Sequence, residues 1–159
     1  MSRGLGDVYK RQDWSLLEKN KDLFEFFKFM IDYRKKHPVI RKKLDNAVCG
    51  MEAMHAHDVN AERMEVPQNA KTLAVSFAGY DRKKGKDDLV YVAVNAYWEE
   101  VKITLLNLAN HGAWYLSVDT YGDEKGKYFY QEGEEIRIDR EYVMKPRSIV
   151  VFTGREILR

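Results

Sequence analysis

The change to a two-residue alternation of apolar and polar residues at Thr72 most constrains how this chain can fold. Leu73, Val75 and Phe77 alternate with smaller or polar residues, and further short apolar runs follow at 89–95, 101–105, 114–119, 136–138 and 148–153. Polar turns separate the runs, and no helix-period segment lies between them. Six or more such strands predict a mostly β fold, an antiparallel sandwich or barrel over residues 72–159.

A segment with helical periodicity precedes these strands. Asn20 is placed to cap a helix over residues 21–36, and Pro38 disfavours helix at the residue before it. The helix carries a broad apolar face, with a stripe at helical spacing and two phenylalanines beside it: Leu23, Phe26, Phe27, Met30 and Ile31, then Phe24 and Phe29. A face of this size must pack against something large, yet little apolar sequence follows at once. We therefore expect its packing partner to lie outside this chain or far along it.

Two segments show neither periodicity. Residues 46–71 carry scattered methionines and Pro67, and we expect an irregular connector there. Residues 1–12 read MSRGLGDVYKRQ and lack the apolar stretch of a signal peptide. The string GLGDVYKRQ resembles a translated sequencing adapter, so we expect a non-native or disordered leader and assign the folded sequence to start near Asp13.

Composition excludes several classes of protein. The most apolar stretch, 23–33, contains three charged residues and is far shorter than the roughly 18 apolar residues that a membrane span needs. The single cysteine, Cys49, excludes an internal disulfide and has no motif of a catalytic thiol around it. The net charge of +2 comes entirely from residues 1–12, so residues 13–159 are neutral. We therefore expect neither a membrane nor a nucleic-acid partner.

Few residues are candidates for binding or catalysis. The aromatic faces of Tyr97, Trp98 and Trp114 can stack on sugar rings. Aromatic residues of small β domains belong more often to the core, so we expect Trp114 in the core and Trp98 to seal a turn or a domain interface. Adjacent Glu99 and Glu100 point apart on an extended segment, which is unsuitable for a general acid and base pair. The sequence His55-x-His57-Asp58 has ligand residue types but no further placed ligands, so we expect ordinary polar contacts, no metal and no cofactor.

Basic residues gather in two runs, 34–43 and 82–86. A nucleic-acid interface would join the two runs into one patch. Alternatively, the two runs are a solvated helix end and a solvated hairpin tip, which need no partner. The zero net charge of residues 13–159 favours this second interpretation.

Two stretches resemble a known family. Residues 13–41, DWSLLEKNKDLFEFFKFMIDYRKKHPVIR, resemble the last helix of the catalytic barrel in bacterial glycogen debranching enzymes of the isoamylase/pullulanase type, within the α-amylase superfamily. Residues 89–100, LVYVAVNAYWEE, followed by Trp114 and Asp119-Thr120, resemble the C-terminal domain of these enzymes. The resemblance is weakest over 46–71, where the family's Trp/Phe-His-Gly segment has diverged.

The resemblance implies a division of the chain and a function. Residues 13–45 would hold the last helix of a (β/α)8 barrel, 46–71 a connector, and 72–159 a C-terminal β-sandwich. The parent enzyme would hydrolyse α-1,6 branch linkages of glycogen or a related α-glucan with a pair of carboxyl groups. These would lie at the ends of barrel strands that precede Asp13, so we expect no catalytic residue in this chain.

The remaining expectations concern partners and location. The partners would be the missing catalytic barrel and, through the parent enzyme, the α-glucan. The lone cysteine and the resemblance favour a cytoplasmic location. The alternative is a stand-alone carbohydrate-binding module that uses Trp98 and Tyr97.

Overall fold

The computed structural model describes residues 13–61, 63, 66–108 and 112–155. Two helices come first, α2 (Leu16–Lys19) and α3 (Lys21–Lys36), and the 3-10 turn η1 (Pro38–Ile40) follows them. The strands are β1 (Met54–His57), β2 (Thr72–Asp81), β3 (Lys86–Asn95), β4 (Val101–Thr104), β5 (Ala113–Asp119), β6 (Ile136–Ile138), β7 (Glu141–Met144) and β8 (Ser148–Arg155).

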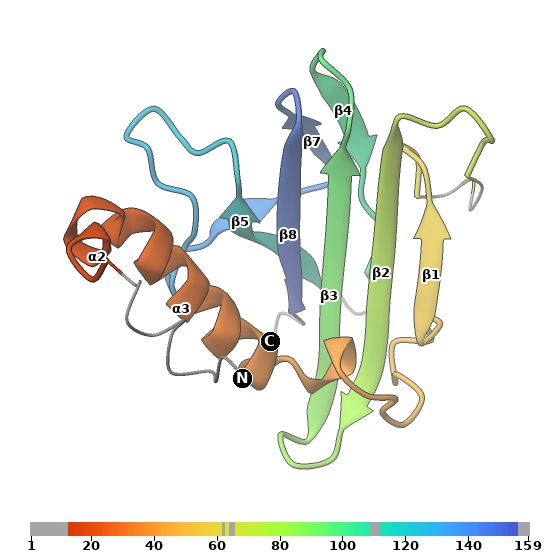
Figure 1. Cartoon of the computed structure of the whole chain (residues 1–159). Coiled ribbons are helices and arrows are strands. Elements are labelled where there is room, and N and C mark those ends of the chain that lie inside the picture. Colours follow the sequence, from red (N-terminus) through yellow and green to blue (C-terminus); the bar gives the residue numbers. More distant parts are fainter. Residues whose placement is uncertain (1–12, 62, 64–65, 109–111, 156–159) are drawn as a thin grey trace, which may run out of the picture.

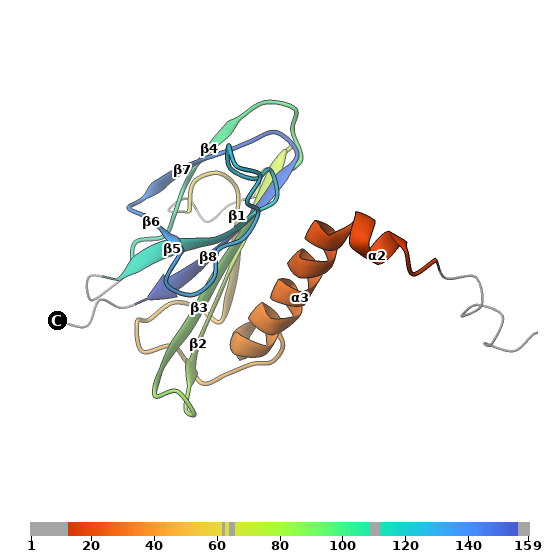
Figure 2. The ribbon, with the colours of Figure 1, turned by 90° about the vertical axis from the view of Figure 1, so that its left-hand side faces the viewer.

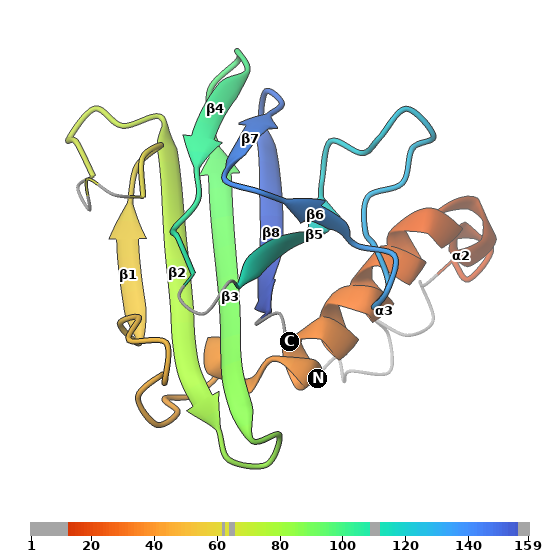
Figure 3. The same ribbon diagram turned by 180° about the vertical axis from the view of Figure 1, so that it is seen from behind.

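The strands form a sandwich-like arrangement that is antiparallel throughout the named pairs. One sheet has the order β1-β2-β3-β8-β5-β6, while β4 and β7 pair separately. Figure 1 shows α3 beside the larger sheet, and the view from behind in Figure 3 shows β4 and β7 on the opposite side. The mostly antiparallel β fold with one long helix, as predicted from the sequence, is confirmed.

The main core fills the space between the two sheets. Tyr91, Trp114 and Phe152 are its largest buried side chains, and they pack with Ile103 of β4 and Met144 of β7. The Trp114 indole N–H donates to the carbonyl oxygen of Leu106 at 2.7 Å, so this buried polar group is satisfied. The expectation that Trp114 belongs to the core is therefore confirmed.

A second apolar cluster joins α3 to the other face of the large sheet. The edge-on view in Figure 2 shows α3 on one side of this sheet and the β4–β7 pair on the other. Phe26, Phe29 and Tyr33 of α3 pack in a cluster with Val90 and Val151 of the sheet. The expectation of a packing partner far along the chain is thus confirmed for Phe26 and Phe29, and the packing on a missing barrel that the resemblance implies is wrong for these two residues.

Buried polar contacts fix the end of α3 on the sheet. The Tyr33 hydroxyl lies 2.8 Å from the Thr153 hydroxyl, and burial raises the pKa of Tyr33 well above its ordinary value. Asp88 of β3 accepts from the backbone N–H of Val39 at 3.0 Å and lies 2.6 Å from Nδ1 of His37. These bonds connect residues far apart in sequence, so the helix end is anchored and its orientation on the sheet is specified.

Several local details differ from the sequence predictions. Asn20 precedes α3 as expected, but its side-chain amide donates backwards to the carbonyl oxygen of Leu16 rather than capping the helix. The segment 46–71 is not wholly irregular, because it contains β1, which pairs with β2 at the sheet edge. The short strand β7 was also not predicted. The proposed leader, residues 1–12, lies outside the described residues.

No helix in the described part of the chain is long and apolar enough to cross a membrane.

Cys49 is partly buried, and its backbone N–H donates to Asp87 at 2.8 Å. Burial raises the pKa of the Cys49 thiol, which lowers the fraction present as the nucleophilic thiolate.

Candidate functional site

The two predicted sugar-contact residues lie in the turn between β3 and β4. Asn95, fully buried at the end of β3, organises this turn through its side chain. Its amide donates to the carbonyl oxygens of Glu99 and Lys145, and its side-chain oxygen accepts the backbone N–H of Tyr97. The turn therefore presents its aromatic pair from a fixed backbone.

Tyr97 and Trp98 form an exposed aromatic platform. Their ring centroids are 4.2 Å apart, and Trp98 is 64% exposed. The Lys71 ammonium lies 3.8 Å from the centre of the Tyr97 ring and 5.5 Å from that of Trp98, within the range of cation–π attraction. A sugar that stacks on the same face of Tyr97 must first displace Lys71, whereas Trp98 offers more open surface.

The adjacent glutamates make different contacts, Glu100 through its side chain and Glu99 through its backbone. Glu100 forms an ion pair with Lys145, and the carbonyl oxygen of Glu99 accepts the Asn95 amide. Both glutamates are exposed. The Glu100 carboxylate is thus engaged by Lys145, and the argument that the two glutamates are no general acid and base pair stays a prediction.

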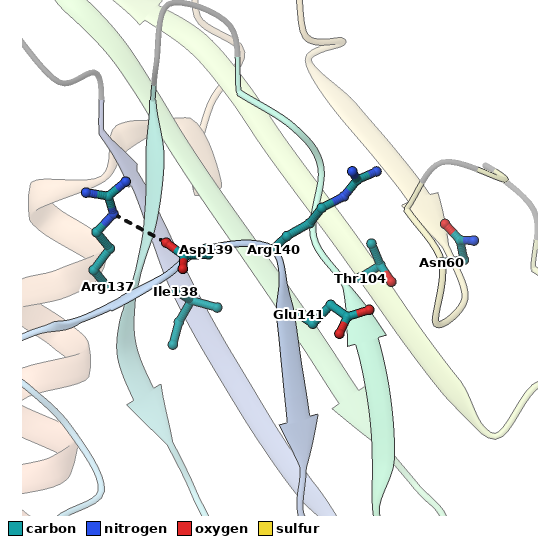
Figure 4. A pocket seen from close by; sticks show the side chains of 7 residues that line it. All are labelled: Asn60, Thr104, Arg137, Ile138, Asp139, Arg140 and Glu141. Atoms are coloured by element: carbon teal, nitrogen blue, oxygen red, sulfur yellow. Dashed lines mark ion pairs between the residues drawn. The ribbon is translucent and has the colours of Figure 1, made fainter.

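A polar cleft lies beside the two-stranded sheet. It has a volume of about 740 Å³, and its lining comes from β6, the β6–β7 turn, the start of β7, the end of β4 and the segment after β1: Asn60, Thr104, Arg137, Ile138, Asp139, Arg140 and Glu141. Figure 4 shows Arg137 and Asn60 at opposite ends of this group. Arg137 and Asp139 are 3.7 Å apart, and Glu141 pairs with Lys102 at 3.0 Å. The lining has no aromatic ring on which a sugar would stack.

His57 of β1 points into the sandwich, whereas His55 is partly exposed and its Nδ1 lies 3.1 Å from Oε2 of Glu52. His57 is completely buried, and its ring centre lies 6.2 Å from that of His55 and 5.2 Å from that of Tyr91. His57 Nδ1 lies 2.8 Å from the carbonyl oxygen of Asp58. Nε2 of both histidines, the Tyr91 hydroxyl and Asp58 Oδ1 are buried and have no hydrogen-bond partner among the described residues. The prediction of ordinary loop contacts is therefore wrong for His57.

This polar cluster is too small for a metal site by the usual ligand count. Within the described ranges, no three His, Cys, Asp or Glu side chains come together as a metal site would require. Burial lowers the pKa of His57, which favours the neutral imidazole at neutral pH.

The outward side of α3 is the most unusual surface of the described chain. Leu23, Phe24, Phe27 and Ile31 are all about half exposed or more, and they share one side of the helix at i, i+1, i+4 and i+8. We call these four residues the outer helix face. Three further exposed apolar residues precede it, Trp14, Leu16 and Leu17.

Sequence reasoning detected the apolar excess of this helix but not its division into two faces. Phe26 and Phe29 meet the sheet, while Phe24 and Phe27 do not. A helix with two apolar sides has a broader stripe than one partner needs, and the width of the pattern is the signal that would have indicated two partners.

Comparison with known proteins does not identify a family for this chain. The chain matches no protein-family model, and no curated protein matches it.

Proposed function

We propose that this chain is the C-terminal part of a glycogen debranching enzyme, a glycoside hydrolase that acts on α-1,6 branch linkages of glycogen or a related α-glucan. Residues 13–45 would supply the last helix of the catalytic barrel, 46–71 a connector and 72–159 the C-terminal β-sandwich. The chain itself is a structural accessory part, and the catalytic carboxyl groups belong to the barrel. We also propose a cytoplasmic location, on the resemblance and the lone cysteine.

The outer helix face is the observation that carries this proposal. Monomeric proteins rarely expose contiguous apolar patches larger than a few hundred Å², and larger patches usually mark an interface. Phe27 alone is 59% exposed, and three large apolar neighbours share its side of α3. A helix that packs on the sandwich with one side and on a barrel with the other would need this pattern.

The anchored end of α3 fits the same role. Because Tyr33 and His37 bind the helix to the sheet through buried polar contacts, the outer helix face is held at a fixed orientation to the sandwich. A helix that is held rigidly on the sandwich and also packs on a neighbouring domain would fix the orientation of that domain relative to the sandwich. We propose that it aligns the sandwich along the flank of the barrel and excludes water there.

An activity assay tests whether the catalytic groups lie outside this chain. The chain described here should release no reducing sugar from pullulan or glycogen, because the parent's acid and nucleophile lie in the barrel. A pullulan-hydrolysing enzyme added to the same mixture is the positive control. Measurable turnover by the pure chain would contradict the proposal.

A second candidate function rests on the Tyr97–Trp98 platform, a stand-alone carbohydrate-binding module. Its test is the migration of the chain in native gels that contain glycogen. Retardation that Trp98→Ala abolishes and Trp14→Ala preserves would favour the module, since both tryptophans are strongly exposed and only Trp98 belongs to the platform. Migration that glycogen does not affect would exclude it.

A further inference from the structure

The fold brings the two basic runs of the sequence to one place. They line a cleft of about 660 Å³ between the end of α3, residues 41–45 and the β2–β3 hairpin tip. Eight of its 13 lining residues are Lys or Arg and two are Asp. This basic cleft thus has a formal charge of +6, whereas the whole chain has +2. Residues 13–159 carry no net charge, yet their positive charges gather at this cleft.

Backbone contacts build this juxtaposition. The N–H of Tyr80 donates to the carbonyl oxygen of Asp45 at 2.9 Å, which ties the segment after η1 to β2. Gly79 permits the close approach, because a Cβ atom there would lie 2.7 Å from Cβ of Leu44. The cations that precede Leu44 are consequently held near those of the hairpin tip.

Part of the positive charge has a local explanation. Lys35 pairs with Asp32, Lys36 lies 3.8 Å from Glu132, and the Lys84 ammonium donates to the carbonyl oxygen of Lys36. Lys35 and Lys36 also suit the negative end of the α3 dipole. These contacts account for the cations at the helix end.

Four other cations have no such role. The side chains of Arg41, Lys42, Lys43 and Lys83 are exposed and form no ion pair with any residue in the described ranges. The two carboxylates of the cleft do not neutralise them, because Asp45 pairs with Arg82 and Asp81 accepts the backbone N–H of Lys83. These like charges line one cleft and repel one another, and a bound anion would offset that repulsion.

We infer that the basic cleft binds a compact polyphosphate group, such as the phosphate chain of a nucleoside triphosphate or free polyphosphate. Its volume lies within the usual range for small-molecule sites. Ammonium and guanidinium groups bind phosphate oxygens through charge-assisted hydrogen bonds, and adjacent phosphates can engage several of the four unpaired cations. The cleft is short and bounded by a hairpin tip and a helix end, which favours a compact anion over a nucleic-acid strand. This inference is independent of the debranching role.

Calorimetric titration with inorganic tripolyphosphate at low salt tests the inference. The wild-type chain should bind it, orthophosphate should bind more weakly, and added salt should weaken both because it screens exposed charges. Lys42→Ala/Lys43→Ala should weaken tripolyphosphate binding by about tenfold or more. The control Lys19→Ala/Lys21→Ala removes the same charge near the opposite end of α3 and should change the affinity less than about twofold.

The outcomes distinguish a nucleotide from free polyphosphate, and both of these from a nucleic-acid strand or a general charge effect. Equal affinity for ATP and tripolyphosphate would support recognition of the phosphate chain alone, and tighter ATP binding would support a nucleotide. Equal weakening by the two double variants would overturn the inference, since it would show only a general charge effect. Absence of tripolyphosphate binding would also overturn it, as would a preference for single-stranded DNA over tripolyphosphate at equal phosphate concentration.

Discussion

Three hydroxyl groups from distant parts of the chain meet beneath α3. The Thr153 hydroxyl lies 2.8 Å from the hydroxyls of both Tyr33 and Ser117, so helix, β5 and β8 share one buried hydrogen-bonded chain. Such buried polar groups specify one docking arrangement, because a displaced partner leaves an unsatisfied hydroxyl in the interior.

Tyr33→Phe tests this anchor at the scale of one hydroxyl. We expect the free energy of unfolding to fall by about 1 kcal/mol, the usual net value of an intramolecular hydrogen bond. Urea denaturation provides the measurement. Tyr121→Phe, which removes a hydroxyl from an exposed ring, should stay within about 0.5 kcal/mol of wild type. Equal losses in the two variants would argue against a specific anchor.

His57 predicts how stability depends on pH. Burial, foremost, lowers its pKa in the folded state, and the hydrogen bond to Asp58 opposes this only in part. The unfolded chain therefore takes up a proton at a higher pH than the folded chain does. The contribution of His57 is complete above its ordinary pKa and is lost as pH falls through that value toward the folded pKa.

The corresponding experiment compares wild type with His57→Phe. Wild type should lose stability between about pH 7.5 and pH 5.5, and the variant should show a flatter dependence over that range because the buried titratable group is gone. The urea midpoint at each pH is the measurement, with Tyr121→Phe as a variant that leaves the slope unchanged. An identical slope for wild type and His57→Phe would contradict this assignment.

At the scale of elements, α3 has two apolar sides with different consequences for stability. Phe29 stacks on Phe129 at a centroid distance of 4.6 Å, while Phe27 is exposed. Phe29→Ala should lower the free energy of unfolding by about 2–3 kcal/mol, since it removes packed surface. Phe27→Ala should change it by less than about 0.5 kcal/mol. A large loss on Phe27→Ala in this chain would show that the outer helix face already has a partner.

Sequence predicted the elements whose patterns are long. The helix bounds 21–36 agree with α3, and β2, β3 and β8 have clear apolar runs. In contrast, β1 reads MHAH and β7 reads EYVM, each four residues long, and neither is long enough to establish an alternation. Their strand state depends on pairing with β2 and β4, which local sequence does not encode.

The candidate sites show the same limit. The sequence offered Trp98 as a sugar contact or as a residue that seals a turn or a domain interface, and the structure places it, exposed, in the turn after β3. The basic cleft did not follow, because its two runs meet through tertiary contacts, such as the Tyr80 N–H to Asp45 carbonyl bond and the close approach of Gly79 to Leu44, which no local pattern indicates. The buried position of His57 depends likewise on small residues opposite it, such as Ala74, which are noticed only once the strand register is known.

At the scale of the whole molecule, we interpret the chain as one side of a domain interface. The sandwich has its own core, and α3 adds a second apolar cluster on the outside of the sheet. The outer helix face is then the one large apolar surface on α3 that the described residues leave uncovered. In the complete enzyme that we propose, Phe27→Ala would be as costly as Phe29→Ala is here.

The DNA sequence upstream of the Asp13 codon in the source genome tests this interpretation most directly. We predict that the reading frame continues upstream into alternating strands and helices of a (β/α)8 barrel, with acidic residues at the ends of strands four, five and seven. An upstream frame that encodes an unrelated domain, or a native start codon directly before Asp13, would contradict it.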